Sequence, residues 1–124
     1  MQADALRELV ITALQDMKGS DIRVLDVRGL TVLTDFMVIA SGTSDRHVKS
    51  LARNVQDEAR RAGVKPMGVE GEAEGEWVLV DLCDVVVHVM RPQMRDFYNL
   101  EKLWSVAPEA EPLPQARAAA REQR

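Results

Sequence analysis

The sequence has a single cysteine, Cys83, and few aromatic residues, 4% of 124 positions. One cysteine excludes a disulfide within the chain and fits a reducing compartment. No apolar run approaches the roughly 20 residues that a membrane-spanning helix needs. The first residues also lack the basic and apolar pattern of a signal peptide, because Asp4 stands where that pattern carries positive charge. We therefore expect a cytoplasmic protein.

The sequence also has fewer basic than acidic residues. The chain has 16 Lys and Arg against 20 Asp and Glu, a formal net charge of −4. Proteins that recognise nucleic acid draw much of their affinity from clustered Lys and Arg, so the composition argues against direct nucleic-acid recognition. The stretch from Glu70 to Asp84 contains several acids and no Lys or Arg. Such a stretch is expected to attract a basic surface.

Two segments show the apolar spacing of amphipathic helices. Apolar residues recur at i, i+3, i+4 and i+7 over residues 6–17, and Gly19 follows them. The same spacing over residues 48–62 follows the capping residues 43–45 and stops before Gly63. A third, short or broken helix is expected between residues 93 and 104.

Runs of β-branched and apolar residues predict strands at residues 22–27, 36–40, 67–69, 77–81 and 85–90. The last two are joined by residues 82–84, short enough for a hairpin, and are apolar on both faces, as covered strands are. The order is helix, two strands, helix, three strands, helix. It predicts an α/β fold with a mixed sheet of about five strands sandwiched by helices.

The composition changes from residue 107 onward to Pro, Ala, Glu, Gln and Arg. These residues bury too little apolar surface to offset the entropy of ordering. We therefore expect one folded domain over residues 1–106 and a disordered tail over residues 107–124.

The turn at residues 41–44 joins a predicted strand to a predicted helix. This arrangement presents backbone amides to a phosphate in nucleotidyltransferase folds. Those enzymes also need two carboxylates one residue apart on the following strand to hold metal ions, and residues 64–69 contain no acid. We read the turn as a helix cap. The alternative is a nucleotide-binding or nucleotidyltransferase-type enzyme that uses Gly42, Thr43 and Ser44.

Cys83 and His88 are candidates for a nucleophile and its base. On one strand they would lie about 16 Å apart and, at an odd offset, point to opposite faces. A Cys83–His47 pair stays open, although a lone buried thiol is far commoner than a catalytic one. One cysteine and two histidines lack the paired spacing of zinc ligands. We expect no catalytic residue, metal or cofactor, and we interpret His88 as a packed strand residue or part of a contact surface.

Aromatic residues accompany the acidic stretch. Trp77 opens the predicted hairpin, and Phe97 and Tyr98 follow shortly after it. Aromatic anchors beside complementary charge are typical of protein interfaces. We interpret Trp77 as a residue at the rim of a surface that faces a basic protein, and the chain as a protein-binding module.

Three stretches of the sequence carry a family resemblance. They are residues 34–48 (Thr-Asp-Phe-Met-Val-Ile-Ala-Ser-Gly-Thr-Ser-Asp-Arg-His-Val), 75–89 (Gly-Glu-Trp-Val-Leu-Val-Asp-Leu-Cys-Asp-Val-Val-Val-His-Val) and 97–104 (Phe-Tyr-Asn-Leu-Glu-Lys-Leu-Trp). Together they resemble the ribosomal silencing factor family, also called the Iojap family, over about residues 5–106.

The resemblance implies a nucleotidyltransferase-like α/β fold without catalytic carboxylates, and a translation repressor rather than an enzyme. Members of that family bind ribosomal protein L14, protein fourteen of the large subunit. They thereby block joining of the small subunit and slow translation when nutrients are short. The resemblance also implies a homodimer when the protein is free.

The contact residues that the resemblance implies lie in the second motif and in or just before the third motif. They are Trp77, Asp81, Leu82, Asp84, Val85, His88, Arg95 and Tyr98. Cys83 stands where the family usually has glycine. If that position requires a positive φ, cysteine bears a strain that glycine avoids.

Overall fold

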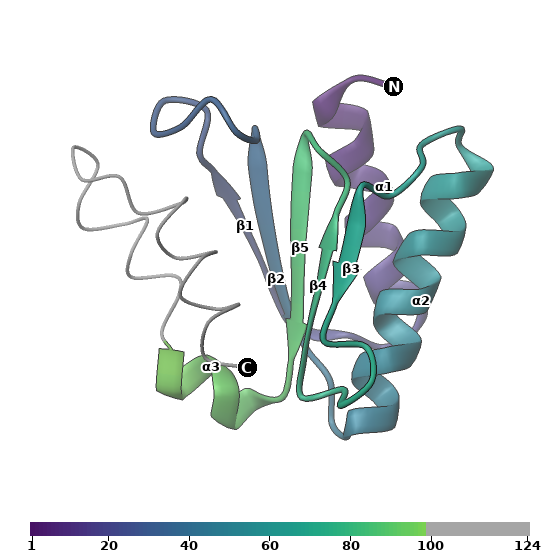
Figure 1. Cartoon of the computed structure of the whole chain (residues 1–124), viewed down its shortest axis with the longest axis vertical. Helices are drawn as coiled ribbons and strands as arrows, with labels where there is room; N and C mark the ends of the chain where they lie inside the picture. The colour runs from purple at the N-terminus through teal and green to yellow at the C-terminus, as the bar shows by residue number, and fades with distance from the viewer. Residues whose placement is uncertain (99–124) are drawn as a thin grey trace.

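The computed structural model describes residues 1–98 as an α/β fold built on one five-stranded sheet (Figure 1). In chain order the elements are α1 (Ala3–Asp16), β1 (Ser20–Asp26), β2 (Phe36–Ser41), α2 (Asp45–Arg61), β3 (Gly68–Glu70), β4 (Trp77–Asp81), β5 (Val85–Met90) and α3 (Pro92–Tyr98). This order confirms the predicted succession of helices and strands. Trp104 and the expected tail at residues 107–124 lie outside the described residues. Within the described part, no helix is both long and apolar enough to cross a membrane.

The first helix packs through the face that its apolar spacing predicts. Leu6, Val10 and Leu14 are buried. The helix ends when the amide N–H of Gly19 donates to the carbonyl oxygen of Leu14 at 2.8 Å. Met17, which the spacing also placed on the apolar face, is exposed because it follows the last helical turn.

The second helix begins and ends at the residues that the sequence marks. Ser44 caps the N-terminus of α2, and its Oγ accepts a hydrogen bond from the amide N–H of His47 at 3.0 Å. Past the C-terminus, Gly63 has a φ of +87°, which glycine adopts without strain. The buried side of α2 consists of Val48, Leu51, Ala52, Val55, Gln56 and Ala59.

The strands are ordered β1-β2-β5-β4-β3, and only β2 and β5 run parallel. Helices α1 and α2 pack side by side on one face of the sheet (Figure 1). Alternation along the strands sends Val38, Val80 and Val87 into this core. The second face carries its own buried cluster, which includes Met37 and Trp77. Among the described residues, Leu25, Leu30 and Met94 are half-buried against that cluster.

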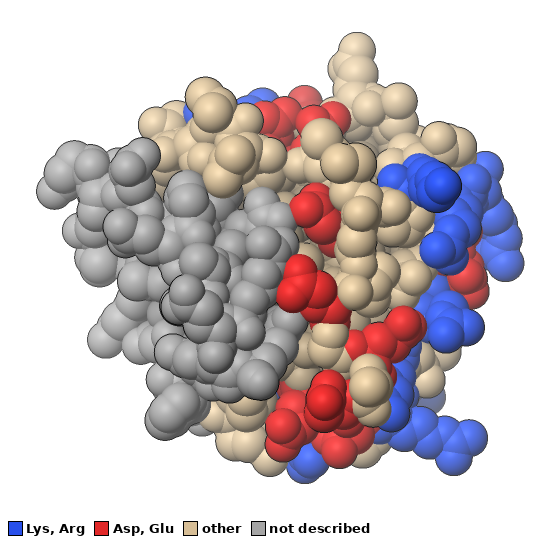
Figure 2. All heavy atoms as spheres, viewed as in Figure 1, with Lys and Arg blue, Asp and Glu red and all other residues tan. Residues whose placement is uncertain are grey.

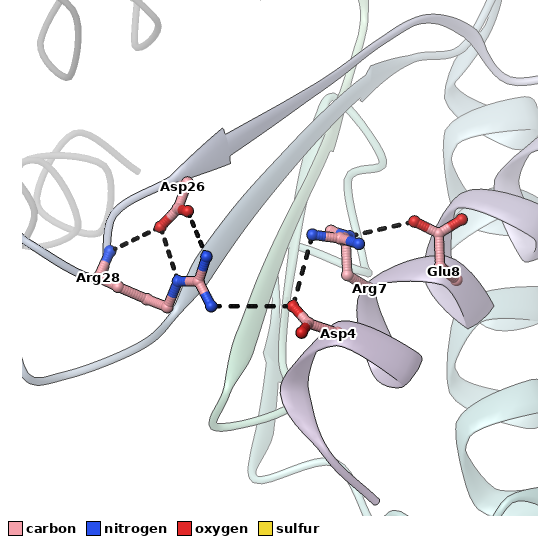
Figure 3. Close-up of polar contacts among 5 residues, drawn as sticks. All are labelled: Asp4, Arg7, Glu8, Asp26 and Arg28. Atoms are coloured by element: carbon pink, nitrogen blue, oxygen red, sulfur yellow. Dashed lines mark hydrogen bonds and ion pairs between the residues drawn. The ribbon is translucent and has the colours of Figure 1, made fainter.

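A group of charged residues fastens the β1–β2 loop to α1 (Figure 3). The guanidinium of Arg28 pairs with the Asp26 carboxylate at 2.6 Å and reaches Asp4 at 3.8 Å, while Arg7 reaches Asp4 at 3.5 Å. Both guanidinium groups also lie over the buried ring of Phe36, 4.7 and 4.8 Å from its centroid. We call Asp4, Arg7, Asp26 and Arg28 the ionic clamp. The hydrogen bonds from Arg28 lower the pKa of Asp26 from 3.8 to about 2.

Candidate protein-contact surface

The turn between β4 and β5 presents two carboxylates at one end of the sheet. Asp81 and Asp84 are half-buried there, and Cys83 between them is exposed. The Asp81 Oδ1 accepts a hydrogen bond from the amide N–H of Cys83 at 2.9 Å. Cys83 has a φ of 75°, in the left-handed region. Cysteine therefore stands at a position that favours glycine, the residue that the family resemblance implies there.

Two other segments are hydrogen-bonded to this turn. The amide N–H of Met67 donates to the carbonyl oxygen of Asp81 at 2.7 Å. On the other side, the amide groups of Asp35 and Phe36 both donate to the carbonyl oxygen of Asp84, at 2.9 and 3.1 Å. The turn thus joins the loop before β2 to the segment before β3.

Both neighbouring segments expose large apolar side chains. Val32 is 100% exposed and Met67 is 71% exposed, and Leu33 is exposed beside Val32. We call Val32, Leu33, Met67, Asp81, Cys83 and Asp84 the turn surface. The three apolar members could not be recognised from the sequence pattern, because apolar residues in a loop have no helix or strand period. The signal available in the sequence was the pair Val32-Leu33 inside a segment with Thr31 and Thr34 on either side.

Trp77 is not the rim residue that its position in the sequence suggested. Its side chain is only 4% exposed, and its Nε1–H donates to Nδ1 of His88 at 2.9 Å. The expectation of an exposed anchor is therefore wrong, because β4 turns Trp77 onto the second face of the sheet, where it packs with Met37 and Met90. His88 is 1% exposed, which confirms the reading of a packed strand residue. Replacing Trp77 with alanine would open a cavity in this cluster, so the change would affect folding before binding.

The remaining predicted contact residues do not form one patch. Leu82 and Val85 are buried in the core beneath the helices. Arg95 is also buried, and it donates to the carbonyl oxygen of Asp21 at 2.5 Å and to Ser41 Oγ at 3.0 Å. Ser41 is at the opposite end of β2 from the turn surface. The backbone of Tyr98 ends α3, and its side chain lies outside the described residues.

The turn at residues 41–44 has the geometry of a helix cap. The Thr43 amide N–H donates to His47 Nδ1 at 2.9 Å, and the His47 amide donates to Ser44 Oγ, so both donors are used within the turn. Asp45 adds a carboxylate to the first turn of α2, where it pairs with Arg91 at 3.2 Å. These contacts leave less room for a phosphate and favour the cap over the nucleotide alternative.

The structure also separates Cys83 from His47. Cys83 comes just before β5, whereas His47 follows the far end of β2, and β2 runs parallel to β5. The two side chains therefore lie at opposite ends of the sheet and form no nucleophile–base pair. The thiol is exposed, not buried as a structural cysteine usually is. Within residues 1–98, no three His, Cys, Asp or Glu side chains gather as a metal-ligand set.

Comparisons with known proteins identify the family. The chain matches the family described as "Ribosomal silencing factor during starvation" over residues 1–124. The ribosomal silencing factor of Chromobacterium violaceum is 51% identical over 104 residues, covering 84% of this chain and 85% of that protein. The one from Bacillus subtilis is 40% identical over 111 residues, covering 90% and 94%.

The fold agrees with that assignment. A crystal structure of a Chromobacterium violaceum protein is similar to this structure with a TM-score of 0.83 at 50% identity, covering 85% of this chain and 88% of that chain. The α/β fold with a mixed five-stranded sheet is confirmed, while the likeness to nucleotidyltransferases stays a prediction. On sequence and on structure, the chain belongs to the ribosomal silencing factor family.

Proposed function

We propose that this protein represses translation by binding the large ribosomal subunit through ribosomal protein L14 and blocking association with the small subunit. It acts in the cytoplasm when nutrients are limiting, and by occupying a surface rather than by catalysis. Membership of the silencing factor family supports the general role. The resemblance of the three sequence motifs implies the partner and the steric mechanism.

The turn surface is the observation that carries the proposal. It combines exposed apolar side chains with the carboxylates of Asp81 and Asp84. Apolar contact area beside charge complementary to the partner is the composition of protein interfaces. Asp35, whose amide N–H donates to the Asp84 carbonyl oxygen, adds a third acid at this end, where its carboxylate also interacts with the guanidinium of Arg28. The local excess of negative charge suits a basic ribosomal protein.

The buried residues that the resemblance implies have an indirect role in this proposal. Trp77 and His88 hold β4 and β5 together from the second face, while Leu82 and Val85 anchor the turn in the core. Arg95 ties α3 to the sheet through Ser41. We propose these five as positioning residues, with Asp81, Asp84 and, at the end of α3, Tyr98 as direct contacts.

The test compares two charge reversals at opposite ends of β4. The Asp84→Lys variant places a cation in the turn surface, and the Glu74→Lys variant makes the same charge change on the exposed loop before Trp77. Purified large and small subunits are mixed at joining magnesium with each variant, and the joined fraction and the bound protein are read by sedimentation. We expect the wild type and Glu74→Lys to stay on the large subunit and reduce joining. Asp84→Lys should bind about tenfold more weakly or worse, because it sets like charges against each other in the interface.

Two other outcomes would contradict the proposed site or the proposed function. If Glu74→Lys fails and Asp84→Lys works, the contact lies on the 71–76 loop instead of the turn surface. If the wild-type protein leaves joining unchanged and does not sediment with the large subunit, the proposed function is wrong.

A further inference from the structure

The outer side of α2 carries a row of cations. Arg46, Lys49, Arg53 and Arg60 are spaced so that they share one side of the helix, roughly opposite the buried side that contacts the sheet. We call these four residues the basic stripe. From Arg46 to Arg60 the stripe extends about 21 Å along the helix axis. In Figure 2 the blue side chains gather on the side of the molecule where Figure 1 shows α2, next to the acidic side chains around the loop before β4.

Acidic neighbours neutralise one part of the basic stripe. Arg53 pairs with Glu72 at 3.5 Å, and Arg60 pairs with Asp57 at 3.8 Å. Arg46 and Lys49 have no ion pair among the described residues. The stripe therefore keeps a net positive charge, concentrated at its N-terminal half.

Arg46 is placed where it does not help the helix. It is the second residue of α2, and the N-terminal end of a helix carries a positive partial charge that disfavours cations. Arg46 is exposed, and with Lys49 it lines an open hollow on the surface, together with Met17 and Glu72. A cation at such a position is explained better by a ligand than by helix stability.

The C-terminal end of the basic stripe is close to the turn surface in the chain. After Arg60 and the end of α2, only a short connection leads to Met67, whose amide bonds to Asp81 in the turn. A partner that covers the turn surface is therefore adjacent to one end of the stripe. The stripe then extends away from that contact along α2.

We propose that the basic stripe contacts the phosphate backbone of ribosomal RNA beside the protein that the turn surface binds. The inference rests on the proposed function, because it assumes docking on a ribosomal subunit. A straight row of cations complements a row of phosphates, which repeats at regular spacing along a strand. The net charge of −4 does not oppose this, because the contact depends on local charge, and Arg46 and Lys49 have no ion pair among the described residues.

The test is the salt dependence of binding to large subunits, measured for a pair of matched double variants. Arg46→Gln/Lys49→Gln removes the two stripe cations without an ion pair in the described structure. Arg23→Gln/Arg61→Gln removes the same formal charge from β1 and from the last residue of α2, and it leaves all four residues of the basic stripe in place. Each phosphate contact contributes about 0.9 to the slope of log affinity against log salt. Between 50 and 200 mM salt, the wild type and the control should therefore lose roughly tenfold more affinity than the stripe variant.

Two further measurements make each outcome decisive. Thermal unfolding midpoints that match the wild type show that the stripe variant is folded. A photo-crosslinking amino acid at Ser50, which lines the same hollow, should attach to RNA in the complex. Attachment to ribosomal protein alone, or a stripe variant with the wild-type salt slope, overturns the inference while leaving the proposed function intact.

If the wild-type protein does not bind large subunits at all, the proposed function fails first. The inference is then decided on deproteinised large-subunit RNA with the same variants. Binding that weakens with salt and depends on Arg46 and Lys49 would retain the stripe as an RNA contact. Absence of such binding would reject it.

Discussion

At the scale of single residues, Cys83 shows a conflict between side chain and backbone. Its φ of 75° crowds the Cβ against the backbone, and the Asp81 carboxylate holds the turn in that shape. Glycine would adopt the same φ without a Cβ. The turn therefore keeps its form at a local cost that glycine would not incur.

Cys83→Gly is expected to stabilise the fold by about 0.5–1 kcal/mol. Relief of the left-handed strain outweighs the larger backbone entropy that glycine gives the unfolded chain. Denaturant unfolding of both proteins measures the difference. Cys83→Ala is the control, since it removes the thiol but keeps the Cβ and should give no such gain. Equal stabilisation by alanine would show that the thiol, not the φ angle, is responsible.

At the scale of elements, the ionic clamp links a loop to a helix through charge. The Asp26 carboxylate accepts hydrogen bonds from Nε and Nη2 of Arg28 at 3.0 and 2.6 Å, and from the Arg28 amide at 3.1 Å. All three stabilise the ionised carboxylate, which is why the pKa of Asp26 falls from 3.8 to about 2. The loop that carries Val32 and Leu33 is thereby held near α1 while Asp26 is charged.

The lowered pKa of Asp26 gives the clamp a defined pH dependence. Because the folded-state pKa lies below the unfolded value, the contribution of Asp26 to stability is present above pH about 4 and is lost as the pH falls through about 2. Asp26→Asn should therefore be less stable than the wild type at pH 5 and converge with it near pH 2. Denaturant unfolding across that range tests this.

Arg28→Gln, which removes the partner, serves as the control for the clamp. In the Arg28→Gln background, adding Asp26→Asn should no longer produce a pH-dependent difference in stability. A gap between the wild type and Asp26→Asn that persists unchanged at pH 2 would contradict the assignment.

The sequence predicts those features of the elements that have a local pattern of residues. The spacing of Val48, Leu51 and Val55 is enough to define α2, and Ser44 and Gly63 mark its ends. The parallel pairing of β2 with β5 has no local signal, because it is set by how distant segments pack. The apolar residues on both faces of β4 predict a strand covered on both sides, which the burial of Trp77 and Val78 confirms, but they do not show which distant segments cover each face.

At the scale of the whole molecule, the strands that are apolar on both faces need no second copy to cover them. All of β2 and β5 is buried within the single chain. The homodimer therefore rests on the family resemblance and on the exposed apolar members of the turn surface. Covering those side chains would remove apolar area from water in the free protein.

We expect the free protein to be a dimer at micromolar concentration, with the turn surface in its interface. Light scattering gives the mass, and Val32→Ser should shift the equilibrium toward the monomer by reducing the apolar area. Lys18→Ser, an exposed change elsewhere, should leave the mass unchanged. A monomer mass for the wild type would reject the dimer, and insensitivity to Val32→Ser would place the interface on another surface.

The carbonyl oxygen of Asp84 accepts hydrogen bonds from the amides of Asp35 and Phe36, so the acidic turn is fixed to the chain that directly follows the apolar loop. Neither can move away without breaking both bonds. These two segments therefore have little conformational freedom in the free protein. A preorganised surface loses less conformational entropy when a partner binds it. Recognition then depends on shape fixed in advance, so a mutation that loosens the Asp84 carbonyl would weaken binding through flexibility while every contacting side chain remained in place.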